Sequence, residues 1–244
     1  MSKKNNKEYM KEDIDIQNIR SVLRMTEYLK RLFYSYNSIC ETLSEFLEQQ
    51  YYVYNELNFQ SANSEVIETY NKSIIFMNES IKGILTDSLS GTDYVDTQII
   101  KPVEKDYYTH NINLTYFIND SSTLSRFLGM VSNVSITEIN NQIILERSNE
   151  QYVFSKFKFC ENILIDDFRY HLDAYIHQTK KLIGFFYKDV EYVKNAVRTL
   201  LMIISETVSS GISKKHIKNW ECVIEEIKDC INLIKTCTVI SNTM

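Results

Sequence analysis

The stretch VLRMTEYLKRLFYSYNSICETLSEFLEQQYYVYNEL, residues 22–57, repeats core-type side chains at steps that alternate between four and three. The repeat consists of Val22, Thr26, Leu29, Phe33, Tyr36, Cys40, Leu43, Leu47, Gln50, Tyr54 and Leu57. Such spacing over five heptads is typical of a helix that packs along one seam against other helices. Because the seam contains Tyr, Phe, Cys and Thr, it predicts a mixed helical bundle rather than an isolated two-stranded zipper.

The scarcity of glycine and proline supports a helical fold. The 244 residues include five glycines and one proline, where average usage would give about 17 and about 12. Tight turns, hairpins and barrel corners depend on these two residues. The composition therefore favours a few long helices with few connections over an all-β or α/β fold.

Three further helices are expected after a turn at residues 58–64. One begins near Val66 and runs past Pro102, whose ring removes a helical hydrogen bond and predicts a kink. One spans about 156–206, and a shorter one spans about 214–240. Residues 129–155 are rich in β-branched side chains and asparagine, which fits either a loop or a short hairpin around Asn140 and Asn141. We expect a long connection there.

The lengths of these helices predict the architecture and the assembly. A helix of 50 residues is about 75 Å long, so three of them should form an elongated body with an exposed apolar seam. A second copy of the chain is expected to cover that seam. The residues expected to form the core or the dimer contact are Leu29, Phe33, Tyr36, Leu43, Leu47, Phe186 and Val193.

Motifs that bind cofactors or carry out catalysis are missing from the sequence. It contains no GxGxxG, P-loop or GxSxG motif. Asp167 with His171 and Asp173 with His177 are spaced i,i+4, which fits surface ion pairing, whereas a di-metal bundle needs Glu-x-x-His motifs on different helices. The net charge of −5 disfavours a large nucleic-acid surface. We therefore expect no enzyme activity, cofactor, metal or nucleic-acid partner.

The first residues and the cysteines indicate a location in the cytoplasm. Residues 1–13 are polar and basic and are expected to be disordered. They lack the apolar segment of a signal peptide, and no run approaches 18 apolar residues. The five cysteines lie far apart without a CxxC pair, which is typical of reduced thiols.

Clusters of basic residues are the candidate binding surface. Lys156 and Lys158 open the third long helix, with Arg126 and Arg147 on either side of the connection before it. Each near-surface Lys or Arg contributes about 1 kcal/mol to binding of an anionic membrane. The alternative is an ordinary solvated face with no ligand.

Two stretches of the sequence, together with the order and spacing of the proline and the long helices, resemble the BAR domain family, and a third stretch resembles one of its subgroups. The stretch IIKPVEKDYY, residues 99–108, is similar to the proline-containing part of the family's second helix. YVKNAVRTL, residues 192–200, resembles the end of its third helix. HIKNWECVIEEIKDCINLI, residues 216–234, resembles the final helix of sorting-nexin BAR domains, here without their PX domain. The resemblance covers roughly residues 14–206, with residues 207–244 as a C-terminal helix that packs on or extends the bundle.

This resemblance implies an all-α fold, an elongated antiparallel three-helix coiled coil with kinked helices that forms a crescent-shaped dimer. Pro102 then marks a kink, and Arg126, Arg147, Lys156 and Lys158 become candidate contacts with anionic phospholipid. The partner is a second copy or a related BAR-like subunit, and the protein is cytoplasmic and peripherally bound to membrane. The expected function is a non-catalytic scaffold that senses or shapes membrane curvature in vesicle trafficking or endocytosis.

Two other functions remain open at the level of sequence. A coiled-coil adaptor that binds proteins and ignores lipid has the same seam and the same dimer. An enzyme or a compact helical inhibitor instead requires a globular monomer.

Overall fold

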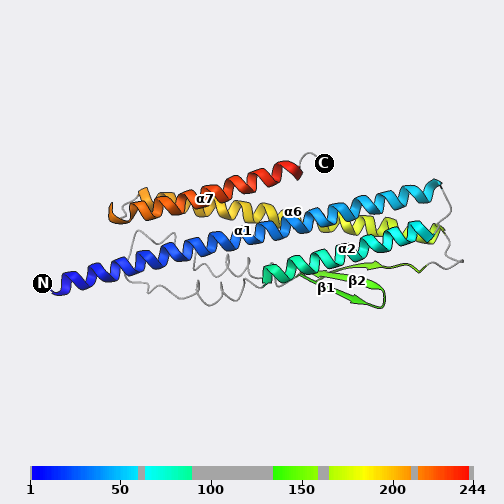
Figure 1. Ribbon diagram of the computed structural model, residues 1–244, viewed down its shortest axis with the longest axis horizontal. Helices are drawn as coiled ribbons and strands as arrows, with labels where there is room; N and C mark the ends of the chain where they lie inside the picture. The colour runs from blue at the N-terminus through cyan, green and yellow to red at the C-terminus, as the bar shows by residue number, and fades with distance from the viewer. Residues whose placement is uncertain (1, 60–63, 90–133, 159–164, 210–213, 242–244) are drawn as a thin grey trace. The chain divides into compact units, whose positions relative to one another are not determined.

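The computed structural model describes residues 2–59, 64–89, 134–158, 165–209 and 214–241. Its helices are α1 (Ser2–Phe59), α2 (Ser64–Leu89), α6 (Ile165–Ser209) and α7 (Lys214–Ser241). Its strands are β1 (Val134–Ile139), β2 (Gln142–Arg147) and β3 (Glu150–Ser155) (Figure 1). The described chain is thus mostly helical, as the composition predicts, with one small sheet that the all-α prediction lacks.

Residues 134–155 form a three-stranded antiparallel sheet of order β1-β2-β3. Two-residue turns at Asn140–Asn141 and Ser148–Asn149 join the strands, with positive φ at all four residues, between 48° and 71°. Asparagine tolerates this left-handed conformation, and such turns match the twist of paired strands. The expectation of a long connection was therefore wrong, and the alternative of a hairpin around Asn140 and Asn141 is confirmed.

The helix boundaries differ from those expected at several points. Helix α1 begins at Ser2, so it includes residues 2–13, for which disorder was expected. Helix α6 begins at Ile165 rather than near Lys156, because the chain through Ser155 is occupied by β3. Helix α2 ends at Leu89, and Pro102 with its predicted kink lies outside the described residues.

The chain divides into two compact units, and α1 and α6 contribute to both. The first unit comprises Met1–Phe33, Gly91–Leu128 and Glu191–Met244, and the second comprises Tyr34–Ser90 and Gly129–Val190. The domain boundaries expected at residues 14 and 206 stay predictions.

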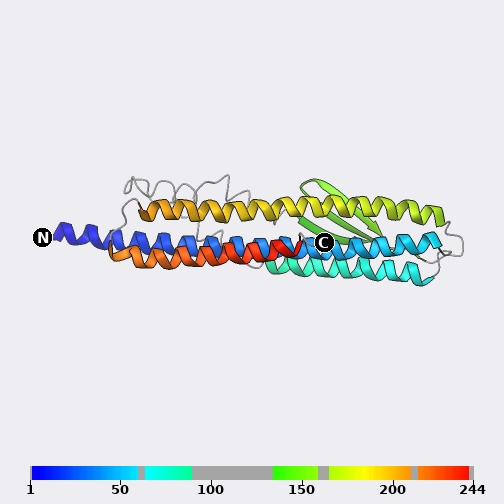
Figure 2. The same ribbon diagram turned by 90° about the horizontal axis from the view of Figure 1, so that it is seen from above.

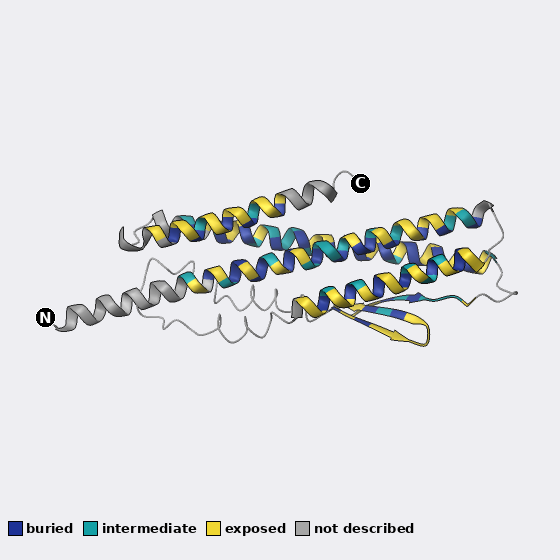
Figure 3. Cartoon of the chain, in the orientation of Figure 1, coloured by how far each residue is buried: buried dark blue, intermediate teal, exposed yellow. Residues whose placement is uncertain are grey.

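The described core of the first unit is a helical seam (Figure 3). Its α7 side chains repeat at steps of three and four, the spacing of coiled-coil contacts. They are Trp220, Val223, Ile227, Cys230 and Ile234. Those of α1 include Val22, Met25, Leu29, Leu32 and Phe33, and those of α6 are Val193, Val197, Leu200 and Ile204.

The second unit packs the sheet against three helical segments. In both views α2 runs alongside the Tyr34–Phe59 part of α1 (Figure 1 and Figure 2). The Tyr70 ring of α2 lies 6.3 Å from Phe46 of α1 and 6.1 Å from Phe168 of α6, measured between ring centroids. The Phe154 ring of β3 lies 5.5 Å from that of Phe46. Aromatic packing thus joins the sheet to the helices.

Candidate functional site

The four basic residues expected to contact lipid have different surroundings. Lys158 is exposed. The Lys156 side chain is 19% exposed and its ammonium group is paired with the Glu138 carboxylate of β1. Arg147, the last residue of β2, has a side chain that is 13% exposed. Arg126 lies outside the described residues.

Strand alternation explains why Arg147 is buried. Successive side chains of a strand point to opposite faces, and Ile143 and Leu145 of β2 are fully buried. Arg147 continues this inward row. Its Nη2 donates to Oδ2 of Asp189 on α6, whose side chain is 14% exposed.

Aromatic rings enclose the guanidinium group of Arg147. Its Cζ lies 5.1 Å from the ring centroid of Phe185 and 4.8 Å from that of Phe186. A cation in this position is attracted by the negative face of the ring. Nη1 is buried without a hydrogen-bond partner, so Asp189 and the two rings are the groups that offset the cost of burying this charge.

Cys40 of α1 lies within the electrostatic reach of this ion pair. The pKa of its thiol is raised to about 12, first by burial and then by the Asp189 and Glu41 carboxylates, while the Arg147 cation acts to lower it. The thiol is therefore protonated at neutral pH. Because the thiolate is the nucleophilic form, the raised pKa makes Cys40 less reactive than an exposed free cysteine.

A second set of contacts joins β3 to α6 next to Arg147. The Glu150 carboxylate accepts hydrogen bonds from Lys181 Nζ at 2.8 Å and from the Tyr152 hydroxyl at 2.6 Å. These two bonds hold the pKa of Glu150 below its usual value. The Oε1 atom of Gln178 accepts a hydrogen bond from the backbone N–H of Val153 at 2.9 Å. The bonds with Lys181 and Gln178 attach β3 to α6, whereas the bond from Tyr152 to Glu150 lies within β3.

This polar group, which we term the hairpin clamp, comprises Arg147, Glu150, Tyr152, Lys181 and Asp189. The opposite charges of the clamp form two ion pairs, Arg147 with Asp189 and Lys181 with Glu150. The lowered pKa of Glu150 favours its ionised carboxylate, which is the form that pairs with Lys181. General acid–base catalysis needs a group that exchanges a proton near neutral pH. The clamp is better suited to holding the sheet on α6.

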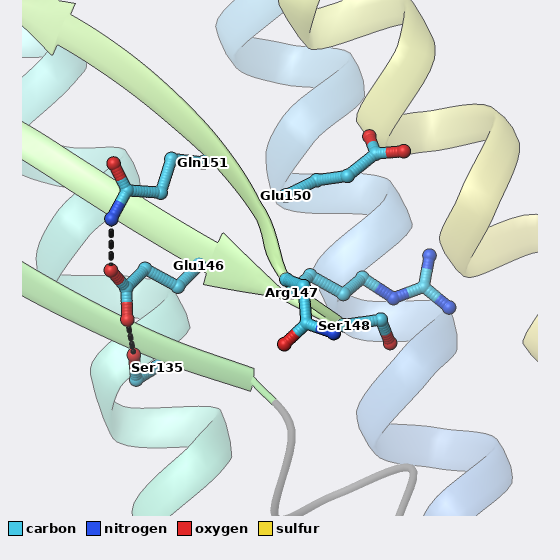
Figure 4. Close-up of a pocket in the computed structure, with 7 residues that line it drawn as sticks. Ser135, Glu146, Arg147, Ser148, Glu150 and Gln151 are labelled. Atoms are coloured by element: carbon cyan, nitrogen blue, oxygen red, sulfur yellow. Dashed lines mark hydrogen bonds between the residues drawn. The ribbon is translucent and has the colours of Figure 1, made fainter.

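A polar hollow of about 660 Å³ lies at the β2–β3 turn (Figure 4). In Figure 4, Arg147 and Glu150 extend toward α1 and α6, whereas Ser135, Glu146 and Gln151 lie on the other side of the hairpin. The Glu146 carboxylate accepts hydrogen bonds from Ser135 and Gln151. The lining is Ser135, Glu146, Arg147, Ser148, Asn149, Glu150 and Gln151. Arg147 and Glu150 instead bond to Asp189, Lys181 and Tyr152, which lie outside this lining.

The residues expected to form the core or dimer seam lie inside the single chain. Those that are at most 1% exposed are Leu29, Phe33, Tyr36, Leu43, Phe186 and Val193. Leu47 is half-buried. Their burial within one chain makes them core residues, and a dimer contact through them stays a prediction.

The described residues contain no group of three or more His, Cys, Asp and Glu side chains arranged to hold a metal ion. His171 instead lies in the aromatic cluster, with its ring 6.2 Å from that of Tyr175. Within the described part of the chain, no helix has both the length and the apolar character needed to cross a membrane.

Sequence reasoning found Arg147 but missed Asp189, Glu150 and Lys181 as its neighbours. The inward row Ile143, Leu145 and Arg147 was the available signal, because a charge that continues a buried row requires a partner. The partner itself lies 42 residues away on another element.

Comparisons with protein-family models, curated proteins and solved structures found no match to this chain. The resemblance to BAR domains therefore stays a prediction.

Proposed function

We propose that this protein is a non-catalytic helical scaffold that binds other proteins through the surfaces of its helices. The observation that carries this proposal is the exposure of large aromatic side chains on three helices. Tyr52 of α1 is 54% exposed, Phe76 of α2 is 51% exposed and Tyr170 of α6 is 75% exposed. Aromatic side chains are enriched at protein–protein interfaces and supply much of their binding energy.

The surroundings of the basic residues favour a protein partner over a membrane. Arg147 and Lys156 are engaged by carboxylates of their own chain. A cation that already has a partner gains less from a phosphate headgroup, because the existing ion pair must first be broken. Among the candidate cations that the structure describes, Lys158 is the exposed one, and Arg126 lies outside the described residues.

The fold of this scaffold is proposed to be an elongated antiparallel three-helix coiled coil that works as a dimer, as in the BAR resemblance. Support comes from the buried seam of α1, which continues from Val22 to Leu57, and from the matching buried row of α6. In the first unit α7 joins this seam. Small-angle scattering and sedimentation equilibrium test the shape and the dimer directly.

The protein-binding proposal is tested by affinity capture with quantitative mass spectrometry. We expect a reproducible set of proteins to be captured by the wild-type chain and depleted at least fivefold by Phe76→Ala combined with Tyr170→Ala. Asp173→Ala, an exposed polar change on α6, is the matched control and should capture the wild-type set. Equal capture by all three chains would count against the helix surfaces as the binding site.

A membrane scaffold is the second candidate, and the exposed lysines of the second unit favour it. Lys158, Lys180 and Lys188 are exposed. The Lys180 ammonium lies 5.2 Å from the ring centroid of Tyr51, and that of Lys188 lies 5.7 Å from Phe185. Lysines beside aromatic side chains suit a membrane interface, where each cation contributes about 1 kcal/mol.

Co-sedimentation with vesicles separates the two candidates. A membrane scaffold binds vesicles that contain phosphatidylserine, loses binding at high salt and loses at least tenfold in affinity when Lys158, Lys180 and Lys188 become Glu. The adaptor remains in the supernatant with these vesicles and with neutral phosphatidylcholine vesicles. Salt-sensitive binding that the triple variant abolishes would replace the adaptor by the membrane scaffold.

A further inference from the structure

The two edges of the sheet differ in how their backbone groups are satisfied. At the β3 edge, the Val153 N–H donates to Oε1 of Gln178 on α6 at 2.9 Å. At the β1 edge, no hydrogen bond to a further strand or to a helix side chain reaches the outward backbone groups within the described residues. Among the described residues, the β3 edge thus has a side-chain partner for the Val153 N–H, and the outward groups of the β1 edge have none.

The turn geometry identifies the outward groups of β1. A two-residue hairpin loop is closed by a hydrogen-bonded pair, here Ile139 with Gln142, and such pairs alternate with non-bonded pairs along the ladder. The N–H and C=O groups of Val134, Ile136 and Glu138 therefore point away from β2. The same alternation makes the backbone N–H of Val153 on β3 point away from β2, which agrees with its hydrogen bond to Gln178.

Strand β1 has little of the usual protection of an open edge. Natural edge strands carry lysine, proline or a bulge that prevents pairing with another strand. The sequence of β1 is VSITEI, with three β-branched aliphatic residues, one carboxylate and an unbroken register with β2. Its carboxylate, Glu138, is already paired with Lys156.

The side chains on the outer face of β1 are exposed, whereas Val134 and Ile136, which carry outward backbone groups, are 5% and 9% exposed. Ser135 and Thr137 of the outer face are exposed, and Ile139 is 54% exposed. Helix α2 lies alongside β1, and its Asn78 side chain lies 3.5 Å from Glu138 Oε2. Asn78 is buried, and so is Ile143, the residue of β2 that pairs with Glu138. Helix α2 therefore contacts the inner side of β1, where the core lies.

The residues of β1 suit an antiparallel pairing with themselves. A register centred on Ile136 pairs Ile136 with its own copy and pairs Val134 with Glu138 of the other chain. All six outward-facing residues are then used, and the two Glu138 carboxylates are not opposite each other. A parallel pairing in register would place them side by side, which is unfavourable.

We propose that β1 is a contact between two copies of this chain, which pair antiparallel about Ile136 into a continuous six-stranded sheet. This inference rests on the dimer of the proposed function and assigns its contact to β1 rather than to the helical seam. It does not depend on whether the scaffold binds proteins or membranes, so the capture and vesicle experiments test a different claim.

The test compares Glu138→Pro with Glu138→Ala in the full chain by sedimentation equilibrium. Both variants lose the Glu138 side chain and its bond to Lys156, but only proline removes the outward N–H, and proline at an outward edge position leaves the β1–β2 ladder intact. We expect wild type and Glu138→Ala to dimerise and Glu138→Pro to dimerise at least tenfold more weakly. Matching far-ultraviolet circular dichroism of both variants verifies folding.

A cross-linking experiment tests the register without proline. In the proposed pairing, Ser135 of one chain lies opposite Thr137 of the other at a non-hydrogen-bonded pair, where Cα atoms approach to about 4.5 Å. That spacing permits a disulfide. A mixture of Ser135→Cys and Thr137→Cys chains should therefore yield a 135–137 linked peptide on mild oxidation, identified by mass spectrometry. Neither variant alone should yield its own 135–135 or 137–137 link at a comparable level.

Three results overturn the inference. One is a wild-type chain that stays monomeric at all concentrations. Another is a dimer that Glu138→Pro and Glu138→Ala affect equally. The third is a mixture of cysteine variants that gives no 135–137 peptide although the wild type dimerises, and this result would leave a dimer through another surface.

Discussion

At the scale of single residues, burial decides how much an ion pair contributes. The side chains of Arg147 and Asp189 are 13% and 14% exposed, whereas those of Arg31 and Glu27 on α1 are 56% and 55% exposed. Removing one partner of a buried pair leaves an uncompensated charge and costs about 3–5 kcal/mol. An exposed pair contributes about 0–1 kcal/mol because water and salt screen it.

We therefore predict that Arg147→Ala lowers the free energy of unfolding by about 3 kcal/mol, measured by urea denaturation. The matched control is Arg31→Ala, which should lower it by less than about 1 kcal/mol. Arg147→Met combined with Asp189→Leu should recover most of the loss, because it removes both charges together. Equal losses for Arg147→Ala and Arg31→Ala would contradict a buried clamp.

The Cys40 thiol predicts a decline of stability at alkaline pH. Its pKa is raised from 9.0 to about 12, so between these values the unfolded chain loses this proton while the folded chain keeps it. The unfolded state then binds fewer protons, and stability falls as pH rises. Urea midpoints between pH 8 and pH 10.5 should fall for wild type and fall less steeply for Cys40→Ala. A slope that Cys40→Ala leaves unchanged would mean that other groups cause the decline.

At the scale of elements, heptad spacing predicted the helices because long seams override weak local preferences. Residues 22–57 lie in α1, and the row at Phe186, Val193 and Val197 lies in α6. The sheet was harder to predict, since short apolar runs with β-branched residues fit strands, loops and helices alike. The left-handed turn at Asn140–Asn141 is what makes this segment a hairpin rather than a loop. Asparagine side chains permit this conformation but do not require it, so the sequence alone left both interpretations open.

Asn71 of α2 holds the segment that follows β3. Its Nδ2 donates to the Phe157 carbonyl at 2.6 Å, and its Oδ1 accepts from the Phe157 N–H at 2.9 Å. Each such bond contributes about 1 kcal/mol. We predict that Asn71→Ala lowers the free energy of unfolding by about 2 kcal/mol and speeds hydrogen exchange in β3.

The matched control is Asn37→Ala, because Asn37 bonds only the exposed Glu41 one turn away on the same helix. It should change stability by less than about 0.5 kcal/mol and leave exchange in β3 unaffected. Exchange in β3 that is equally slow in both variants would show that the aromatic contacts alone hold this strand.

At the scale of the whole molecule, the candidate site was less predictable than the fold. Charge clusters in the sequence do not reveal which cations meet a carboxylate of their own chain, because Asp189 and Arg147 come together only after the hairpin docks on α6. Lys158 and Lys156 are two residues apart, yet one is exposed and the other is paired. The inward row of β2 signals that Arg147 needs a partner, but nothing local in the sequence identifies Asp189 as that partner.

The two compact units should differ in their response to a core cavity. Trp220 of α7 is fully buried in the first unit, and truncating such a side chain costs about 3–5 kcal/mol. Because units of this kind open as separate cooperative regions, we predict that Trp220→Ala speeds hydrogen exchange in α7 and in residues 191–209 of α6. Exchange in β1–β3 and α2 should keep its wild-type rate.

Leu233→Ala, at a side chain that is 41% exposed, is the control and should leave hydrogen exchange in both units unchanged. If Trp220→Ala also speeds exchange in the sheet, the long helices couple the units into one cooperative structure, and a scaffold of this kind would transmit strain from α7 to the hairpin clamp.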